Sequence, residues 1–380
     1  MEDSEAERGT DSGPTVVVSA NSCWNIVNFR AGLIRALIGR GYRVVVAAPE
    51  DVHCPKIGEL GAAFIPVPMD SSGTSVAQDL RLLWRYAKVF RTLRPFAYLG
   101  FTAKPNIYGS MAARTVRAKV INNVSGLGTV FIKKGPLTGL VARLYRVAFR
   151  TSSTVFFQNR DDMELFIANR IARRNQSALL PGSGVDLQRF NPRQSARPPG
   201  PFRFLFLGRL LWDKGVAEYV EAARLVRQSH PEARFQILGP LGVDNRTAVP
   251  SSYLERCRAE TIVEYLGESD DVRDAIEQAD CIVLPSYREG LPRALLEGSA
   301  MGKPVVATDV PGCRDAVDDG ETGYLCEARS APSLAAAMTR MLDLSPADRI
   351  KMGERGRGKV EREFGESIVV AKYLEALGGQ

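Results

Sequence analysis

Short runs of apolar, often β-branched residues alternate with segments of helical periodicity along the whole chain. Continuous apolar runs are typical of strands that are buried on both faces of a parallel sheet. In the first half, the predicted strands are 15–20, 43–49, 63–69, 96–101, 119–124, 154–159 and 177–182. In the second half, they are 202–208, 234–239, 262–267, 281–286, 303–308 and 322–327. Because the alternation occurs twice, the pattern predicts an α/β fold with two doubly wound domains.

The composition changes between the two halves. Residues 186–201 are rich in Pro and Arg and poor in apolar residues, which indicates an interdomain linker. We therefore expect an N-terminal domain at 14–185 and a C-terminal domain at 202–362. An acidic segment, 1–13, is expected to be a disordered tail, and 363–380 to form a C-terminal helix that can pack back on the N-terminal domain. Because doubly wound sheets bind ligands beyond the carboxyl ends of their strands, the two domains are expected to face each other across a cleft.

Charge is distributed unevenly along the chain. The net charge of the 380 residues is +7, but residues 1–190 carry +11 and the remainder carries −4. The basic half is expected to meet an anionic partner, which can be a membrane surface, a phosphate-bearing substrate or a nucleic acid. We see no basic–aromatic interleaving or recognition motif, so no nucleic-acid partner is expected.

Other features of the composition exclude several classes of protein. No apolar stretch approaches the ~18 residues of a membrane span, and the N-terminus lacks the apolar core of a signal peptide. The six cysteines form no C-x-x-C pair and are interpreted as reduced core thiols of a cytosolic protein. The two histidines, His53 and His230, lack ligand spacing, so no metal site is expected.

The stretch FLFLGRLLWDKG, residues 204–215, places two cations after a predicted strand. Gly208 allows a ligand to approach the backbone, while Arg209 and Lys214 bring positive charge to the carboxyl end of the strand. An arginine that binds bidentately and a lysine that adds a point charge suit a diphosphate. The stretch lacks the spacing of a P-loop.

The stretch PSYREGLPRALLEG, residues 285–298, contains two carboxylates eight positions apart. Glu289 is predicted to lie in a turn, and Glu297 about two turns into the following helix. The amides of Gly290 and Leu291 would lie at the helix N-terminus, which attracts phosphate. Since eight helical residues rise about 12 Å, a hydrolase pair, which needs carboxyl groups within roughly 5–9.5 Å, is disfavoured. Instead, each carboxylate is expected to accept hydrogen bonds from hydroxyls of one extended ligand.

Taken together, these motifs resemble a known family. E-x7-E after PSYREG, with GRLLWDKG upstream and GVD..RF at 184–190, is similar to the retaining glycosyltransferases of the GT-B fold, in family 4. The first half, at 98–131 and 156–162, resembles a branch whose members build bacterial surface polysaccharides on polyprenyl diphosphate carriers.

The resemblance implies a catalytic role for three residues. Arg209 and Lys214 would neutralise the donor diphosphate, which is also the leaving group. Glu289 would contact the hydroxyls of the donor sugar, with the amides of Gly290 and Leu291 nearby. Charge that grows on the departing nucleoside diphosphate would then be met by fixed cations and helix amides.

The resemblance also implies the remaining contacts to the donor and the reaction itself. Glu297 would bind the ribose, Leu266 and Gly267 would present backbone to the base, and Gly208 would lie beside the diphosphate. The implied activity is retaining transfer of a hexose or N-acetylhexosamine, by front-face attack, from a nucleotide sugar to a lipid-diphosphate-linked sugar. UDP is the nucleotide expected by analogy, with GDP left open, and neither a cofactor nor a metal is expected.

The chain departs from the family pattern in the first half. The segment 19–32 lacks the Gly-Gly loop of many relatives, and neither histidine suits the place of their active-site histidine. Asn123 can occupy comparable space, or it can be an ordinary turn asparagine. Lys104 and Asn106 follow a predicted strand and are candidates to line the acceptor side, with ordinary capping as the alternative.

The segment 132–150 has apolar residues at helical spacing and basic residues beside them. The basic residues are Lys133, Lys134, Arg143, Arg146 and Arg150. Basic amphipathic helices can lie on anionic membranes, although such a stripe can equally pack on its own domain. We expect a cytoplasmic, peripheral enzyme on the inner face of the cytoplasmic membrane.

Three other functions stay open on the sequence alone. A nucleotide-sugar epimerase can share the two-domain architecture and would consume the donor without an acceptor. A basic nucleic-acid-binding or nucleic-acid-modifying protein would give a salt-dependent gel shift. A noncatalytic partner could retain the fold, although the intact motifs argue against it.

Overall fold

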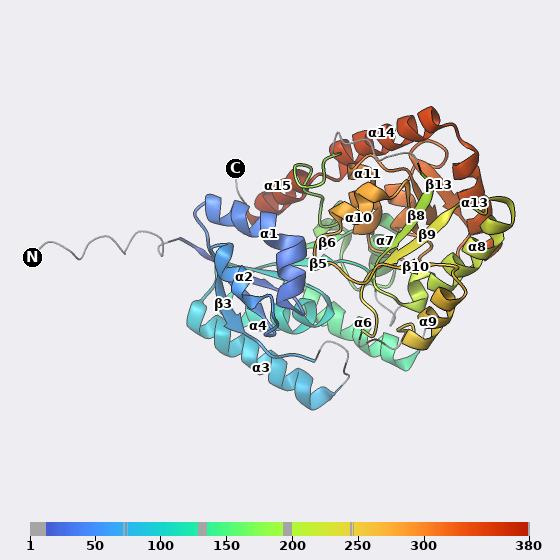
Figure 1. Ribbon diagram of the computed structural model, residues 1–380. Helices are drawn as coiled ribbons and strands as arrows, with labels where there is room; N and C mark the ends of the chain where they lie inside the picture. The colour runs from blue at the N-terminus through green and yellow to red at the C-terminus, as the bar shows by residue number, and fades with distance from the viewer. Residues whose placement is uncertain are drawn as a thin grey trace, which may run out of the picture. The chain divides into compact units, whose positions relative to one another are not determined.

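Each half of the chain is built on one parallel sheet (Figure 1). The computed structural model describes residues 13–70, 73, 75–127, 135–192, 200–243, 245 and 247–378. The chain divides into two units, Met1–Ser183 with Ser367–Gln380, and Gly184–Glu366. Every strand predicted from the apolar runs is confirmed, with ends that differ by a few residues.

The first unit holds a seven-stranded sheet with the order β3-β2-β1-β4-β5-β6-β7. Its strands are β1 (Thr15–Ser19), β2 (Arg43–Ala48), β3 (Ala63–Pro66), β4 (Ala97–Phe101), β5 (Lys119–Val124), β6 (Ser152–Phe157) and β7 (Ser177–Leu179). Its longer helices are α1 (Cys23–Gly39), α2 (Cys54–Glu59), α3 (Val76–Leu93), α6 (Pro136–Phe149), α7 (Arg160–Ala168) and α15 (Glu366–Leu377). Its short helical segments are η1 (Pro105–Gly109), α4 (Ser110–Ala113), η2 (Arg114–Val116) and η3 (Arg174–Gln176).

Both faces of the first sheet are buried. Val16 and Val18 of β1 pack in one apolar cluster with α1, α2 and α15, whereas Val17 packs in a second cluster with α3, α4, α6 and α7. In Figure 1, α1 and α2 lie on one side of this sheet, and α3, α4 and α6 lie on the other. Because successive side chains of a strand point to opposite faces, a strand covered on both sides has to be apolar at every position, as the runs predicted.

The second unit holds a six-stranded sheet with the order β10-β9-β8-β11-β12-β13, packed into one apolar cluster. Its strands are β8 (Arg203–Leu207), β9 (Arg234–Leu238), β10 (Glu264–Tyr265), β11 (Cys281–Leu284), β12 (Val305–Thr308) and β13 (Gly323–Cys326). Its helices are η4 (Trp212–Lys214), α8 (Val216–Ser229), α9 (Ser251–Ala259), α10 (Arg273–Gln278), α11 (Arg293–Ala300), α12 (Cys313–Ala316), α13 (Ala331–Asp343) and α14 (Pro346–Glu363).

The segment predicted as a linker contributes to the second core. Phe190 is 2% exposed and belongs to the apolar cluster of the second unit, and Leu187 packs against it. These two apolar side chains therefore attach the first part of the otherwise polar segment to the core of the second unit. The rest of that linker, 193–199, and most of the predicted acidic tail, 1–12, lie outside the described residues.

The C-terminal helix belongs with the first unit. Val369, Tyr373 and Leu377 recur every four residues along α15 and are buried in the same cluster as α1. The helix begins at Glu366 and not at the predicted residue 363, which is the last residue of α14. The chain thus returns to the first unit to cover the sheet face that α1 and α2 leave open.

Candidate functional site

The two charged motifs found in the sequence follow neighbouring strands of the second sheet. β8 pairs with both β9 and β11, so the strand order reverses beside it. Such a switch point, at the carboxyl ends of the strands, is where doubly wound sheets bind ligands. Gly208 follows β8, and the loop 285–290 follows β11.

The backbone after β8 and the backbone after β9 approach each other closely because both residues at this point are glycines. A Cβ atom on Gly239, after β9, would lie 1.9 Å from the carbonyl oxygen of Gly208. Both glycines have positive φ angles, +157° at Gly208 and +152° at Gly239, which residues with a Cβ rarely adopt. The next residue, Arg209, is exposed, and no described residue forms a hydrogen bond or an ion pair with its guanidinium.

The loop after β11 is fixed to the segment that carries Lys214. The amide of Tyr287 donates to the carbonyl of Asp213 at 2.9 Å, and the Ser286 hydroxyl donates to the same oxygen at 3.2 Å. As a result, Lys214 Nζ forms an ion pair with the Glu289 carboxylate, and the two side chains are 21% and 11% exposed. The structure therefore brings the predicted catalytic cation and the predicted catalytic carboxylate into contact.

The turn that holds Glu289 and Gly290 rests on Gly312, which follows β12. The Glu289 amide donates to the Pro311 carbonyl at 3.2 Å. Gly312 has a φ of +81°, and a Cβ atom there would lie 2.3 Å from the Gly290 oxygen. Leu291 is 8% exposed and packs in the core, so its side chain anchors the turn just before α11. The amides of Gly290 and Leu291 thus precede the helix, as predicted.

Glu297 lies one turn into α11, not about two as predicted, because Pro292 delays the helix start to Arg293. Arg293 Nε and Nη2 lie 2.9 and 2.6 Å from Glu297 Oε1. The Glu297 side chain is buried, and burial raises the pKa of its carboxyl group above the usual range, while Arg293 opposes the rise. Sequence analysis missed Arg293, although its i,i+4 spacing from Glu297 is the signal of a helical ion pair.

Leu266 and Gly267 follow β10 at the same edge of the sheet. The Leu266 amide donates to the Ile237 carbonyl at 2.8 Å, and the Leu266 side chain is 38% exposed. The Gly267 carbonyl accepts from the Gly239 amide at 2.9 Å, and Gly267 has a φ of +85°. The backbone after β10 is therefore tied to the glycine that abuts the end of β8.

This edge of the second sheet combines complementary chemistry. Arg209 and Lys214 supply positive charge, and Glu289 and Glu297 supply carboxylates that accept hydrogen bonds. Such a set can bind a ligand that is anionic in the middle and carries hydroxyls toward its ends. The Tyr287 hydroxyl donates to Glu218 of α8 at 2.7 Å, which fixes the loop after β11 to that helix. Sequence analysis did not single out Tyr287.

In the first unit, Lys104 is paired with a residue of its own unit. Its Nζ lies 2.7 Å from Asp79 Oδ1, and the Tyr108 hydroxyl donates to the other Asp79 oxygen at 2.7 Å. The side chains of Lys104 and Asp79 are 13% and 18% exposed. A contact between Lys104 and an acceptor stays a prediction. In such a contact, Lys104 would bind the acceptor and Asp79 at the same time.

Asn106 and Asn123, also predicted for the acceptor side, are buried. They are 1% and 0% exposed, and the Asn106 amide nitrogen donates to the Asn123 carbonyl at 2.8 Å. Asn123 Nδ2 donates to the Tyr373 hydroxyl at 2.9 Å, which fixes α15 to β5. Both side chains are therefore held in an internal hydrogen-bond network with partners on neighbouring elements. Their contact with an acceptor stays a prediction.

The predicted basic helix is α6, and its arginines have different surroundings. Arg146 donates to the carbonyls of Asn169 and Arg170 after α7, at 3.0 and 2.9 Å, so it holds the fold together. Arg143 and Arg150 are exposed. Lys133 and Lys134 lie outside the described residues. The helix also exposes three apolar side chains, Leu137 by 37%, Leu140 by 50% and Val147 by 48%.

A second helix with exposed apolar side chains, α3, was missed by sequence analysis. Val76, Leu80 and Trp84 recur every four residues and are 69%, 61% and 62% exposed. Basic side chains stand beside them, and Lys88 Nζ lies 5.7 Å above the Trp84 ring. The i,i+4 spacing was visible in the sequence, but only the structure tells that this stripe is not covered by its own unit.

Two further properties concern membranes and metals. Among the described residues, no helix is both long enough and apolar enough to cross a membrane. One group of possible metal-ligating side chains, Cys23, Asp51 and Cys54, brings its ligand atoms within 4.8 Å of one another in the described part of the chain.

Two family models match the chain, one in each unit. The model described as "Glycosyl transferase 4-like domain" matches residues 26–183, and the model described as "Glycosyl transferases group 1" matches residues 188–359. The two matches together span most of the chain.

Individual relatives agree with the family models. The N,N'-diacetylbacillosaminyl-diphospho-undecaprenol alpha-1,3-N-acetylgalactosaminyltransferase of Campylobacter jejuni is 26% identical over 368 residues, which are 92% of this chain and 95% of that protein. The capsular polysaccharide biosynthesis glycosyltransferase CapM of Staphylococcus aureus is 23% identical, over 81% of this chain and 82% of that protein. HepE of Anabaena, solved in complex with UDP-glucose, superposes with a TM-score of 0.79 at 15% identity, over 96% of this chain and 99% of that chain. That likeness confirms the predicted fold class.

Proposed function

The chain belongs to the GT-B glycosyltransferases that combine a 4-like domain with a group 1 domain, and we propose that it is a retaining enzyme that uses a nucleotide-diphosphate sugar, with UDP as the nucleotide. The group transferred is a hexose or an N-acetylhexosamine. The acceptor is a sugar linked to a lipid diphosphate, and the product enters a surface polysaccharide or a related glycan. The names of the Campylobacter and Staphylococcus relatives support this choice of acceptor and pathway class.

The observation that carries the proposal is the ion pair between Lys214 and Glu289, together with the exposed Arg209 on the segment after β8 that also carries Lys214. When the donor binds, its diphosphate takes Lys214 and Arg209 as partners, and Glu289 accepts hydrogen bonds from the sugar hydroxyls instead. The positive charge is then fixed where negative charge grows as the bond from the anomeric carbon to the phosphate oxygen breaks. Glu289 thus holds Lys214 in position until the substrate replaces it.

The remaining donor contacts follow from the same sheet edge. Glu297, oriented by Arg293, accepts hydrogen bonds from the ribose hydroxyls, and the backbone at Leu266 and Gly267 faces the base. The amides of Gly290 and Leu291 add positive partial charge near the diphosphate. The acceptor hydroxyl attacks the face from which the phosphate leaves, and its proton passes to a leaving phosphate oxygen, so the anomeric configuration is retained. Because protein cations supply the charge, the reaction uses no metal and no cofactor.

A substrate screen tests this function. Radiolabelled nucleotide sugars are incubated with lipid-diphosphate-linked acceptors, and the anomeric configuration of each product is determined. Glu289→Ala and Lys214→Ala should each lower turnover by about a hundredfold or more, whereas Glu354→Ala, on the exposed side of α14, should not change it. Conversion of the donor in the absence of any acceptor would identify an epimerase instead, and near-normal transfer by Glu289→Ala would refute the catalytic assignment.

Association with an anionic membrane on the cytoplasmic side is part of the same proposal. The exposed apolar side chains of α3 and α6, with exposed basic residues beside them, suit the acyl chains and the negative headgroups of such a surface. A lipid-linked acceptor would be reached from there.

Vesicle flotation tests the membrane contact. Binding to vesicles that contain anionic lipid should be measurable at low salt and should fall steeply as the salt concentration rises. Changing Leu80 and Trp84 together to Ser should weaken binding, whereas Ile350→Ser, an equally exposed position in the second unit, should not. Absence of binding at low salt would refute this part of the proposal.

A further inference from the structure

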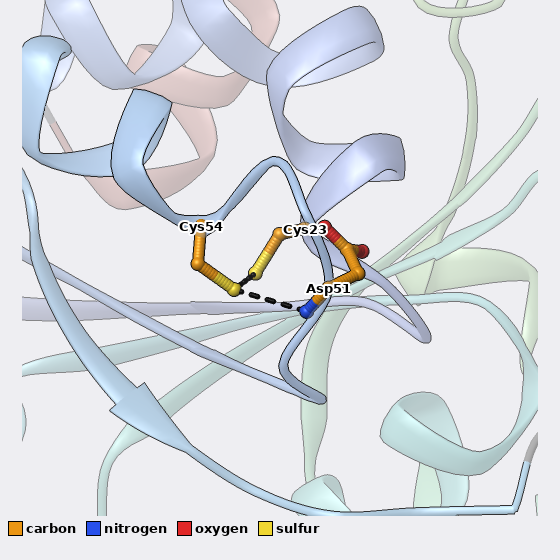
Figure 2. Close-up of side chains that lie close together, drawn as sticks. All are labelled: Cys23, Asp51 and Cys54. Carbon is orange, nitrogen blue, oxygen red and sulfur yellow. Dashed lines mark hydrogen bonds between the residues drawn. The ribbon is translucent and has the colours of Figure 1, made fainter.

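Two cysteines that are far apart in the sequence meet in the first unit. Cys23 begins α1, after β1, and Cys54 begins α2, after β2. Because β1 and β2 are neighbouring parallel strands, their carboxyl ends lie at one edge of the sheet. The two Sγ atoms are 3.0 Å apart, and Figure 2 shows the two side chains pointing toward each other.

The Asp51 carboxylate holds the two segments together through hydrogen bonds that do not involve the sulfur atoms. One of its carboxylate oxygens accepts from the Trp24 amide of α1 at 3.0 Å, and the other accepts from the His53 amide at 2.8 Å. Its own amide donates to Cys54 Sγ at 3.1 Å (Figure 2). The two thiols are thus brought together by the fold before any bond forms between them, which favours a bond within the chain over one to an external thiol.

The two thiols differ in access. Cys23 is 0% exposed and donates to the Pro49 carbonyl at 3.4 Å, whereas Cys54 is only half-buried. Burial raises the pKa of the Cys23 thiol, and the neighbouring Cys54 adds to the rise. An external reagent therefore reaches Cys54 first, and Cys23 is placed behind it to react in a second step. The sequence led us to expect six reduced core thiols. All six cysteines are free in the structure and five are buried, but Cys54 is only half-buried and touches Cys23.

The spacing fits a sulfur–sulfur bond better than a shared metal ion. Two thiolates on one tetrahedral zinc ion, each at about 2.3 Å from it, stand about 3.8 Å apart, which is wider than the 3.0 Å found here. The third potential ligand, the Asp51 carboxylate, already accepts a backbone hydrogen bond on each oxygen. A metal ion would have to separate the sulfurs and compete for these oxygens.

We propose that Cys23 and Cys54 are a modification site that forms a reversible intramolecular disulfide, with a low-molecular-weight disulfide as the oxidant. The Cys54 thiolate attacks the oxidant, a mixed disulfide forms, and one thiol of the oxidant leaves. Cys23 Sγ then attacks Cys54 Sγ and displaces the second thiol. The protein loses two electrons and two protons, and the oxidant is reduced to two thiols. The product joins the start of α1 covalently to the start of α2.

The experiment uses the full chain, equilibrated with mixtures of reduced and oxidised glutathione and then alkylated. Mass spectrometry under non-reducing conditions should show the loss of two thiols together, a single cross-linked peptide pair containing Cys23 and Cys54, and full reversal by dithiothreitol. In Cys23→Ser, Cys54 should accumulate a stable mixed disulfide with glutathione, whereas in Cys54→Ser, Cys23 should stay unmodified. Cys257→Ser, at a buried cysteine of the second unit, is the matched control and should oxidise like the wild type.

Asp51→Asn tests how the pair is positioned. Weakening the charge-assisted hydrogen bonds of Asp51 should lower the oxidised-to-reduced ratio at a given glutathione mixture by about tenfold. The proposal is overturned if both thiols stay reduced in oxidising mixtures, or if the cross-link involves other cysteines. It is also overturned if the reduced protein binds one zinc ion tightly and Cys54→Ser abolishes that binding, because the cluster would then be a metal site.

Discussion

Gly312 offers a test of how the glutamate turn is positioned, because it touches no substrate in the proposed reaction. The change is Gly312→Ala. Its φ of +81° is combined with a ψ of −43°, outside the left-handed helical region, so this backbone conformation costs a residue with a Cβ more than the ~1–2 kcal/mol typical of that region. In addition, the new Cβ would lie 2.3 Å from the Gly290 oxygen and 2.8 Å from the Glu289 oxygen. Since Cβ atoms essentially never come within 3.0 Å of such an atom, the distance between the new Cβ and the Gly290 oxygen has to widen by at least 0.7 Å, which displaces the turn or residue 312 itself.

That displacement sets the expected size of the kinetic effect. A misplacement of about 1 Å in a reacting group can lower the rate by about a hundredfold, so Gly312→Ala should lower kcat by between about tenfold and a hundredfold. The assay is transfer with the donor and acceptor found in the screen, with kcat and KM determined separately. Urea-induced unfolding of the same variant measures the cost to stability.

The matched control is Gly320→Ala in the turn before β13. Gly320 has nearly the same φ, +78°, but a Cβ atom there meets nothing within 4 Å. Both variants should lose unfolding free energy from backbone strain at a positive φ, and only Gly312→Ala should lose turnover as well. Equal kcat values for the two variants would refute the role of Gly312 in holding Glu289.

Three further predictions follow from the contacts. Arg293→Gln removes the cation that opposes the raised pKa of Glu297, so Glu297 should become protonated at a higher pH than in the wild type or in Arg293→Lys. Because a protonated carboxyl group is a weaker acceptor, the KM for the donor should rise at a correspondingly higher pH as the solution is acidified. Identical pH profiles of KM would contradict this. Treatment with EDTA should leave the transfer rate unchanged, since Arg209 and Lys214 supply the positive charge, and a loss of rate that Mg²⁺ restores would refute metal independence. Asn123→Ala should lower the free energy of unfolding by about 1–3 kcal/mol and speed hydrogen exchange in α15, because Tyr373 loses its partner; unchanged stability together with an increased acceptor KM would show instead that Asn123 contacts the acceptor.

The charged residues of the second unit could be predicted because their positions depend on strand ends. Once β8 and β11 are recognised as buried strands, Lys214 and Glu289 must follow neighbouring carboxyl ends, so a meeting at one edge is expected. Their direct ion pair was not predictable, because it depends on the Tyr287–Asp213 hydrogen bond across two loops. The length of the helix before Glu297 was overestimated, because Pro292 caps the helix and α11 begins only at Arg293.

The first unit shows where sequence reasoning reached its limit. Lys104 and Asn106 were chosen because they follow a predicted strand, and Asn123 because it can occupy the place of the relatives' histidine. Burial, however, decides between a ligand and an internal partner. Asn123 pairs with Tyr373, which is 250 residues away in the chain. Likewise, Trp84 is exposed although its helical spacing is that of a core stripe.

The sequence by itself determined the two parallel sheets and the cations and carboxylates at the edge of the second sheet, because buried strands require continuous apolar runs and ligand-binding groups follow their ends. Only the tertiary structure decided which polar groups are covered, which apolar stripes stay open and which thiols touch. Those outcomes depend on contacts between segments far apart in the chain, as the 3.0 Å approach of Cys23 and Cys54 illustrates, and local periodicity carries no information about such contacts.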